Sequence, residues 1–141
     1  MIGGRPWHGG RILVVEDHFL LADVVCDFLR NCGLNPVGPA ATTREATKLA
    51  RRAALDGAVL DLKLGDELCL SVCTILRARR IPFLFLTGYS ELSLIPIEFR
   101  SAPLVCKPFE TNEMKAALSR MLERDLDQSD LFRPLPSVMR N

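Results

Sequence analysis

The sequence has few aromatic residues, almost no net charge and no long apolar run. Aromatic residues make up 6% of the 141 residues, and 18 basic residues balance 17 acidic ones to a net charge of +1. This balance argues against nucleic-acid binding, which usually needs a clustered basic surface. No apolar stretch approaches the roughly 20 residues that span a bilayer, and residues 1–10 lack the layout of a secretion signal. We therefore expect a cytoplasmic protein without a membrane segment or a nucleic-acid partner.

The five cysteines show no CxxC pair and no spacing with histidine that suits zinc. Cys69 and Cys73 are one helical turn apart, which leaves a redox role open. Small apolar side chains that stay reduced are the simpler interpretation, because the cysteines lie mostly in hydrophobic stretches.

The length of the chain suits one domain with a proper core. We expect residues 11–124 to form that domain. Residues 1–10 and 125–141 are expected to be flexible ends, the latter because it carries Pro134 and Pro136 without a sustained apolar period.

Short apolar runs rich in β-branched or aromatic residues predict five strands. They cover residues 12–15, 34–38, 58–60, 83–86 and 104–106. Runs without alternation are typical of strands covered on both faces, as in parallel sheets. Pro36 interrupts the second run and suits an edge strand.

Helical patterns separate the strands. Apolar pairs recur every four residues over 19–29, a capping box opens a helix at Thr42, and a final helix covers 111–123. Asp66 and Glu67 lie where negative charge favours the start of the third helix. The fourth helix, within residues 90–100, is predicted to be short or irregular because Pro96 removes a helical hydrogen bond. This alternation predicts an α/β doubly wound parallel sheet.

Polar residues follow the predicted strands at their carboxyl ends, where open α/β sheets bind ligands. They are Glu16, Asp17, Asp61, Thr87 and Lys107. Each has an ordinary explanation alone, and Asp17 in particular could cap the first helix. Together they place three carboxylates, a hydroxyl and an ammonium at one edge.

Carboxylates this close together repel unless a cation joins them. Mg²⁺ prefers one or two carboxylates, waters and a phosphate oxygen. Such a site suits phosphoryl transfer, in which a carboxylate can be the nucleophile. Asp61 is the best candidate, because it is central in the sheet and precedes a loop, residues 62–65, that can rearrange.

The matching segments resemble the receiver domains of bacterial two-component response regulators. They are VVED at 14–17, LDL at 60–62, LTG at 86–88 and CKPF at 106–109, and the resemblance covers residues 11–123. It implies a flavodoxin-like (CheY-like) fold with five parallel strands in the order 2-1-3-4-5. It also implies that a sensor histidine kinase or histidine phosphotransfer protein transfers a phosphoryl group to Asp61.

The resemblance further implies roles for the other residues. Mg²⁺ would be held by Asp17, Asp61 and the backbone carbonyl of Lys63, with Glu16 acting nearby or through water. Thr87 and Lys107 would contact the phosphoryl oxygens, and the Lys107–Pro108 peptide would be cis.

The segment PFLFLTGY at 82–89 is similar to the Phe-Ala-Thr-Gly-Tyr subgroup, whose fourth helix is often short. Leu86 departs from the alanine of that subgroup. Many receivers carry an aromatic switch residue at the position of Leu104, which is not aromatic. Tyr89 is therefore a candidate for the switch residue. The alternative is that Tyr89 is a partly exposed loop residue without this role.

We expect a single-domain response regulator, because too few residues follow Glu123 for a DNA-binding or enzymatic output. It would act through protein contacts, and the face from Tyr89 to Leu118 would bind an unknown downstream protein or a second copy. One alternative is a small Mg²⁺-dependent phosphatase or hydrolase, although Lys63 stands where a second acid would be expected. Another is a scaffold that is never phosphorylated, against which the complete acidic set argues.

Overall fold

The structure, a computed structural model, describes the backbone of residues 7–132 and the side chains of residues 7–123. In chain order its elements are β1 (Arg11–Val15), α1 (Phe19–Asn31), β2 (Asn35–Ala40), α2 (Thr43–Arg52), β3 (Gly57–Leu60), β4 (Lys63–Leu64), β5 (Glu67–Leu68), α3 (Leu70–Ala78), β6 (Phe83–Thr87), η1 (Tyr89–Leu94), η2 (Ile97–Phe99), β7 (Leu104–Cys106) and α4 (Thr111–Phe132). No helix among the described residues has both the length and the apolar character needed to cross a membrane.

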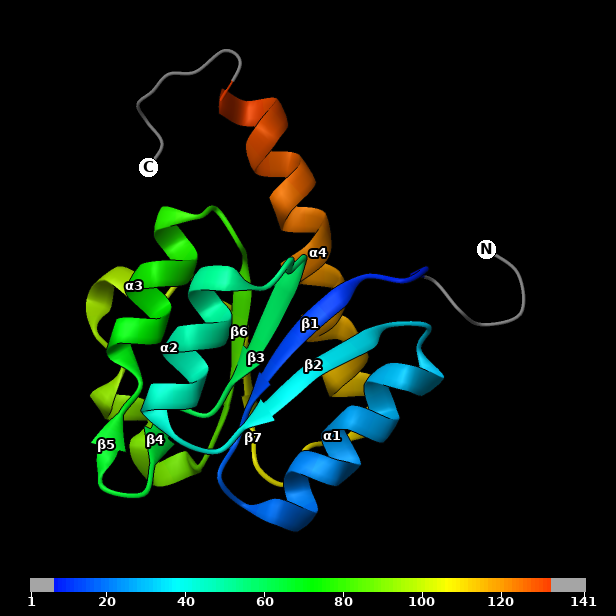
Figure 1. Cartoon of the computed structure of the whole chain (residues 1–141). Helices are drawn as coiled ribbons and strands as arrows, with labels where there is room; N and C mark the ends of the chain where they lie inside the picture. The colour runs from blue at the N-terminus through cyan, green and yellow to red at the C-terminus, as the bar shows by residue number, and fades with distance from the viewer. Residues whose placement is uncertain (1–6, 133–141) are drawn as a thin grey trace.

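Five strands form one parallel sheet in the order β2-β1-β3-β6-β7, with helices on both faces (Figure 1). The hairpin strands β4 and β5 lie outside this sheet, so β6 and β7 are its fourth and fifth strands along the chain and the order is the predicted 2-1-3-4-5. The predicted doubly wound, flavodoxin-like fold is confirmed. The strands end together at the lower edge of the sheet in Figure 1.

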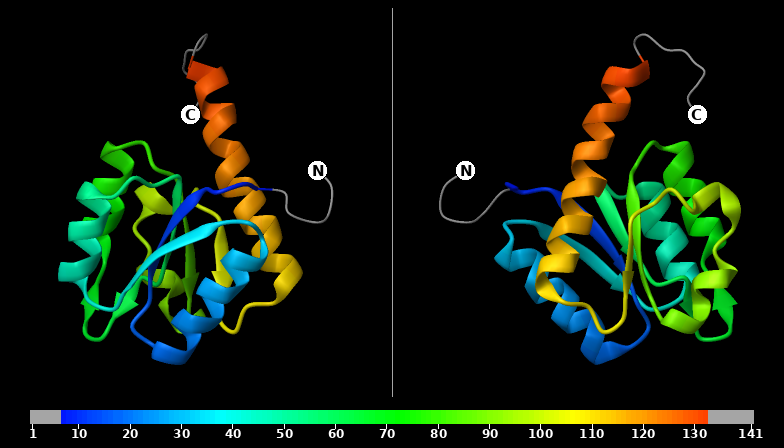
Figure 2. Two further views of the ribbon diagram at one scale, coloured as in Figure 1. Left: turned by 45° about the vertical axis from the view of Figure 1, so that its right-hand side comes forward. Right: turned by 180° about the vertical axis from the view of Figure 1, so that it is seen from behind.

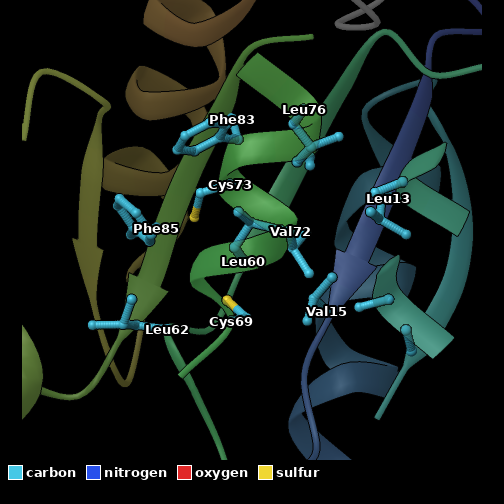
Figure 3. Packing of buried hydrophobic residues seen from close by; sticks show 14 of the residues in the cluster. Leu13, Val15, Leu60, Leu62, Cys69, Val72, Cys73, Leu76, Phe83 and Phe85 are labelled. Carbon is cyan, nitrogen blue, oxygen red and sulfur yellow. The ribbon is translucent and has the colours of Figure 1, made fainter. Parts of the chain in front are cut away.

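The apolar core has two layers. One layer packs α2, α3 and the 3₁₀ turns against one face of the sheet, and Figure 3 shows Leu13, Val15 and Leu60 of the sheet in the same layer as Val72 of α3. The other packs α1 and α4 against the opposite face, through residues such as Leu29 and Met114. Both faces are covered, which explains why the strands are continuously apolar.

The edge position predicted for the second strand is confirmed. Its Gly38 has φ of +101°, and a Cβ there would lie 2.8 Å from the backbone nitrogen of Ala40. The register of β1 with β2 shifts between Leu13 and Val15, beside this glycine. Glycine is therefore required for the bulge in the edge strand.

The region of the fourth helix also follows the prediction. It consists of the two short 3₁₀ turns η1 and η2, and Pro96 is the N-cap residue of the second. The ring of proline fits the first positions of a helical turn but not its interior, so the chain is divided at this point.

The predicted start of the third helix is wrong. Asp66 and Glu67 lie instead in an antiparallel hairpin, where Leu64 pairs with Glu67 across Gly65, whose φ is +58°. Gly65 and Asp66 form a two-residue turn, for which a left-handed glycine is well suited. The helix begins at Leu70, with Cys69 as its N-cap residue.

The last helix is longer than predicted, and the segment before β1 contacts the turn after α1. The backbone of α4 continues to Phe132, nine residues past the predicted end at Glu123, and extends beyond the sheet (Figure 2). At the other end, the backbone nitrogen of Gly9 donates to the carbonyl of Gly33 at 2.8 Å. Residues 1–6 and 133–141, which fall within the ends predicted to be flexible, lie outside the described residues.

Candidate functional site

The structure brings the residues predicted from the strand ends into one cluster. Glu16 and Asp17 follow β1, Asp61 follows β3, Thr87 ends β6 and Lys107 follows β7. Because these strands are parallel and adjacent, their carboxyl ends present these side chains at one edge of the sheet.

Asp61 is the centre of the cluster and is only 4% exposed. Its Oδ2 lies 2.6 Å from Lys107 Nζ, while its Oδ1 accepts hydrogen bonds from Thr87 Oγ1 at 3.1 Å and from the backbone nitrogen of Lys63 at 3.4 Å. Both carboxylate oxygens are therefore oriented by donors from neighbouring strand ends.

Glu16 is also buried, and its environment disfavours its charge. Burial is the main reason that the pKa of Glu16 is raised, and the negative charge of Asp61 adds to the effect. Lys107 Nζ lies 3.1 Å from Oε1 and 3.3 Å from Oε2, and the backbone nitrogen of His18 donates to Oε2 at 3.0 Å. Among the described residues, Oε1 accepts no hydrogen bond of good geometry.

The ammonium of Lys107 partly neutralises these carboxylates. Burial alone would lower the pKa of Lys107, but its hydrogen bonds to Asp61 and Glu16 outweigh burial and raise it. The side chain of Lys107 is therefore held in its charged form beside two buried acids.

Asp17 is exposed and reaches the neighbouring loop rather than the first helix. Its Oδ2 accepts a hydrogen bond from the backbone nitrogen of Gly65 at 2.8 Å, which ties the hairpin to the end of β1. The N-cap residue of α1 is His18, whose imidazole accepts from the backbone nitrogen of Leu21. The alternative role of Asp17 as the cap of this helix is therefore wrong.

The three carboxylates fit a divalent metal ion. Glu16, Asp17 and Asp61 each offer an oxygen, and these oxygens lie within 4.8 Å of one another. The buried Oε1 of Glu16 without a hydrogen bond is an available acceptor in the same cluster. Hard oxygen ligands of this kind suit Mg²⁺. A ligand role for the backbone carbonyl of Lys63 stays a prediction.

Two features of the site had no clear signal in the sequence. The thiol of Cys69 donates to the backbone carbonyl of Asp61 at 3.0 Å, and the amide of Gly65 binds Asp17. The turn residues Gly65-Asp66 could have indicated the hairpin, but the thiol contact depends on tertiary structure.

Tyr89 is 79% exposed at the start of η1, and its role as a switch stays a prediction.

The raised pKa of Glu16 predicts how stability depends on pH. Glu16 binds its proton more tightly in the folded state, so the free energy of unfolding of the metal-free protein should fall as pH rises above about 4.5, the ordinary pKa of glutamate. Metal binds only the ionised carboxylates, so the increase in melting temperature caused by Mg²⁺ should grow over the same pH window. Melting curves with Mg²⁺ or with a chelator measure both effects.

The matched variant is Glu16→Gln, which keeps the shape of the side chain and removes its titration. We expect this variant to lose most of the pH dependence of the metal-free protein and to bind Mg²⁺ about tenfold more weakly, as changes around a metal site commonly do. An unchanged pH dependence would contradict the role assigned to Glu16.

Comparisons with known proteins agree with this geometry. The family model described as "Response regulator receiver domain" matches residues 12–119. The chain is 32% identical over 114 residues to the phyllosphere-induced regulator PhyR of Methylorubrum extorquens, covering 79% of this chain and 43% of PhyR. It spans about half the length of the curated relatives that it matches.

Solved structures show the same likeness. The solution structure of SdrG from Sphingomonas melonis Fr1 has a TM-score of 0.73 and 36% identity, with 81% of this chain and 97% of SdrG covered. A CheY-like receiver domain protein from Methanospirillum hungatei has a TM-score of 0.75 and covers 85% of this chain and 98% of that one, and at 21% identity it supports the fold alone. The chain therefore belongs to the family of response regulator receiver domains.

Proposed function

We propose that the chain is a response regulator receiver that accepts a phosphoryl group on Asp61 in the presence of Mg²⁺. The observation that carries this proposal is the pair of contacts to Asp61, with Lys107 Nζ 2.6 Å from one carboxylate oxygen and Thr87 Oγ1 3.1 Å from the other. A carboxylate flanked by an ammonium and a hydroxyl is arranged to become, and then to retain, an acyl phosphate.

The chemistry is a transfer from a phosphohistidine of the donor. An oxygen of Asp61 forms a bond to phosphorus, while the phosphorus–nitrogen bond to the donor imidazole breaks and that nitrogen keeps the electron pair. Lys107 and Thr87 bind the phosphoryl oxygens, which carry the negative charge. Mg²⁺, held by Asp17 and Asp61 with Glu16 beside them, would neutralise further charge on the same group.

Incubation with acetyl phosphate tests this proposal without a partner protein. In Mg²⁺ the intact mass should increase by one acid-labile phosphoryl group per chain, and a chelator should prevent it. Steady hydrolysis of p-nitrophenyl phosphate would instead favour the small phosphatase. Absence of any uptake would favour the scaffold that is never phosphorylated.

The phosphoryl donor is proposed to be a sensor histidine kinase or a histidine phosphotransfer protein that binds α1. Phe19, Leu20 and Val24 are 76%, 65% and 51% exposed on this helix, which starts two residues after Asp17. A groove of about 460 Å³ between this helix and the start of α4 is lined by Val24, Phe28 and Phe109, among others. Exposed apolar surface beside a reactive site is typical of a protein contact.

Leu20→Arg should therefore slow transfer from a phosphorylated histidine kinase by about tenfold or more, because a charge replaces an apolar contact. Its phosphorylation by acetyl phosphate should not change. The matched control is Ile97→Arg, an equally drastic change at an exposed residue of η2. The histidine kinases are those of a panel that transfer a phosphoryl group to the wild-type chain. If Leu20→Arg and Ile97→Arg slowed this transfer equally, the assignment of α1 as the binding surface for the donor would be contradicted.

The output is proposed to be a protein contact on the face from Tyr89 to Leu118. Four apolar side chains are exposed on η1, η2 and β7 in this face: Tyr89, Leu94, Ile97 and Leu104. A downstream protein or a second copy of the chain would bind there.

We place this activity in the cytoplasm, which is supported by five cysteines without a disulfide.

A further inference from the structure

Cys69 contacts two consecutive carbonyl groups at the end of β3. Its thiol donates to the carbonyl of Asp61 at 3.0 Å, and its backbone nitrogen donates to the carbonyl of Leu62 at 2.8 Å. Cys69 and Leu62 are both fully buried, and Figure 3 shows both below Leu60, with Leu62 to the left of Cys69. One residue of the α3 N-terminus therefore joins that helix to the backbone of the proposed phosphorylation site.

The thiol of Cys69 is suited to act as a donor and not as a reactive group. Cys69 is fully buried among apolar side chains, and a structural cysteine in such surroundings is inert as a nucleophile. If its donor is removed, a buried carbonyl is left without a hydrogen bond and away from water, which costs free energy. The contact of Cys69 with the carbonyl of Asp61 therefore stabilises the folded state.

The segment that follows Asp61 has further contacts at both of its ends. The backbone nitrogen of Lys63 donates to the carboxylate of Asp61, and the amide of Gly65 donates to Asp17. The direction of the peptide groups between Asp61 and Lys63 decides where the carboxylate of Asp61 and the carbonyl of Lys63 point. Cys69 holds these peptide groups from the side of the helix.

We propose that Cys69 is a positioning residue for the metal and phosphoryl site: it holds the backbone of residues 61–63 in the orientation that the carboxylate of Asp61 and the carbonyl of Lys63 need. This inference rests on the proposed function. It assigns to a core cysteine a role that neither redox chemistry nor packing alone would give it.

The test compares Cys69→Ala, Cys69→Ser and Cys26→Ala. Cys26 is a buried cysteine of α1 on the other face of the sheet, so its substitution costs similar packing without touching the site. We expect Cys69→Ala to raise the Kd for Mg²⁺, measured by calorimetry, and to slow phosphorylation by acetyl phosphate, each about tenfold. Cys69→Ser, which keeps a donor, should restore both to within about twofold, and Cys26→Ala should change neither.

Amide chemical shifts of Lys63 and Gly65 in the metal-free protein give a readout that does not depend on phosphorylation. They should move in Cys69→Ala and return toward the wild type in Cys69→Ser. If Cys69→Ala and Cys26→Ala lower the melting temperature equally and leave the Kd and these shifts unchanged, Cys69 only packs the core and the inference is overturned. If the wild type accepts no phosphoryl group, the proposed function fails, while the Kd and the shifts still decide the positioning role.

Discussion

Replacing Asp61 with asparagine is expected to abolish phosphoryl uptake from acetyl phosphate. The amide keeps the shape of the side chain and can still accept from Thr87 Oγ1, which lies 3.1 Å from Asp61 Oδ1. It lacks the nucleophilic oxygen, so the rate should fall roughly 1000-fold or more, as it does when a catalytic nucleophile is removed. Intact mass measured over time gives the rate.

The matched control is Asp66→Asn, in the turn of the neighbouring hairpin. Asp66 is exposed and lies five residues after Asp61, so this variant makes the same chemical change close to the site. It should be phosphorylated at the wild-type rate. Continued uptake by Asp61→Asn would place the phosphoryl group on another residue.

Replacing Lys107 with methionine is expected to change phosphorylation and metal binding in opposite directions. The variant loses the ammonium that lies 2.6 Å from Asp61 and 3.1 Å from Glu16. Phosphorylation by acetyl phosphate should slow by about 100-fold, since a charge that stabilises the transferred group is gone. The Kd for Mg²⁺ should fall several-fold, because the metal becomes the main positive charge near the buried acids.

In the metal-free variant the two carboxylates would face each other without their ammonium. The pKa of Glu16 should therefore rise further, and the protein should melt at a lower temperature near neutral pH than the wild type without metal. Mg²⁺ should recover most of this loss. Lys48→Met, at an exposed position of α2, controls for the loss of one positive charge. Weaker Mg²⁺ binding by Lys107→Met would contradict this electrostatic account.

Much of the fold and most of the candidate site could be predicted from local patterns. Parallel strands in a sheet covered on both faces are continuously apolar, and the residue after each strand lies at the same edge, so Asp61, Thr87 and Lys107 were predictable from position alone. Proline has a direct effect on its own backbone, which is why Pro36 indicated an edge strand and Pro96 a broken helix.

Features that depend on contacts between distant residues were not predictable in this way. Acidic residues favour the first turn of a helix, yet Asp66 and Glu67 lie in a hairpin whose turn is tied to Asp17, 48 residues earlier than Gly65. The first helix is capped by His18, while the carboxylate of the preceding Asp17 accepts a hydrogen bond from Gly65 in that same turn. Turn chemistry and a long-range hydrogen bond outweighed the local preference for helix.

The contact of Cys69 with Asp61 is a further case. An apolar stretch containing a cysteine indicates burial, but it does not indicate which carbonyl the thiol reaches. That depends on where the hairpin places the start of α3 relative to the end of β3.

Reductive trapping tests the central claim most directly. Borohydride reduces an acyl phosphate to an alcohol, so a phosphorylated aspartate becomes homoserine, which peptide fragmentation locates in the chain. After treatment with acetyl phosphate and Mg²⁺, we predict homoserine at position 61 and an unchanged carboxylate at Glu16 and Asp17. Trapping at another acid, or a phosphoryl group that resists borohydride because it lies on another kind of side chain, would contradict the assignment of Asp61.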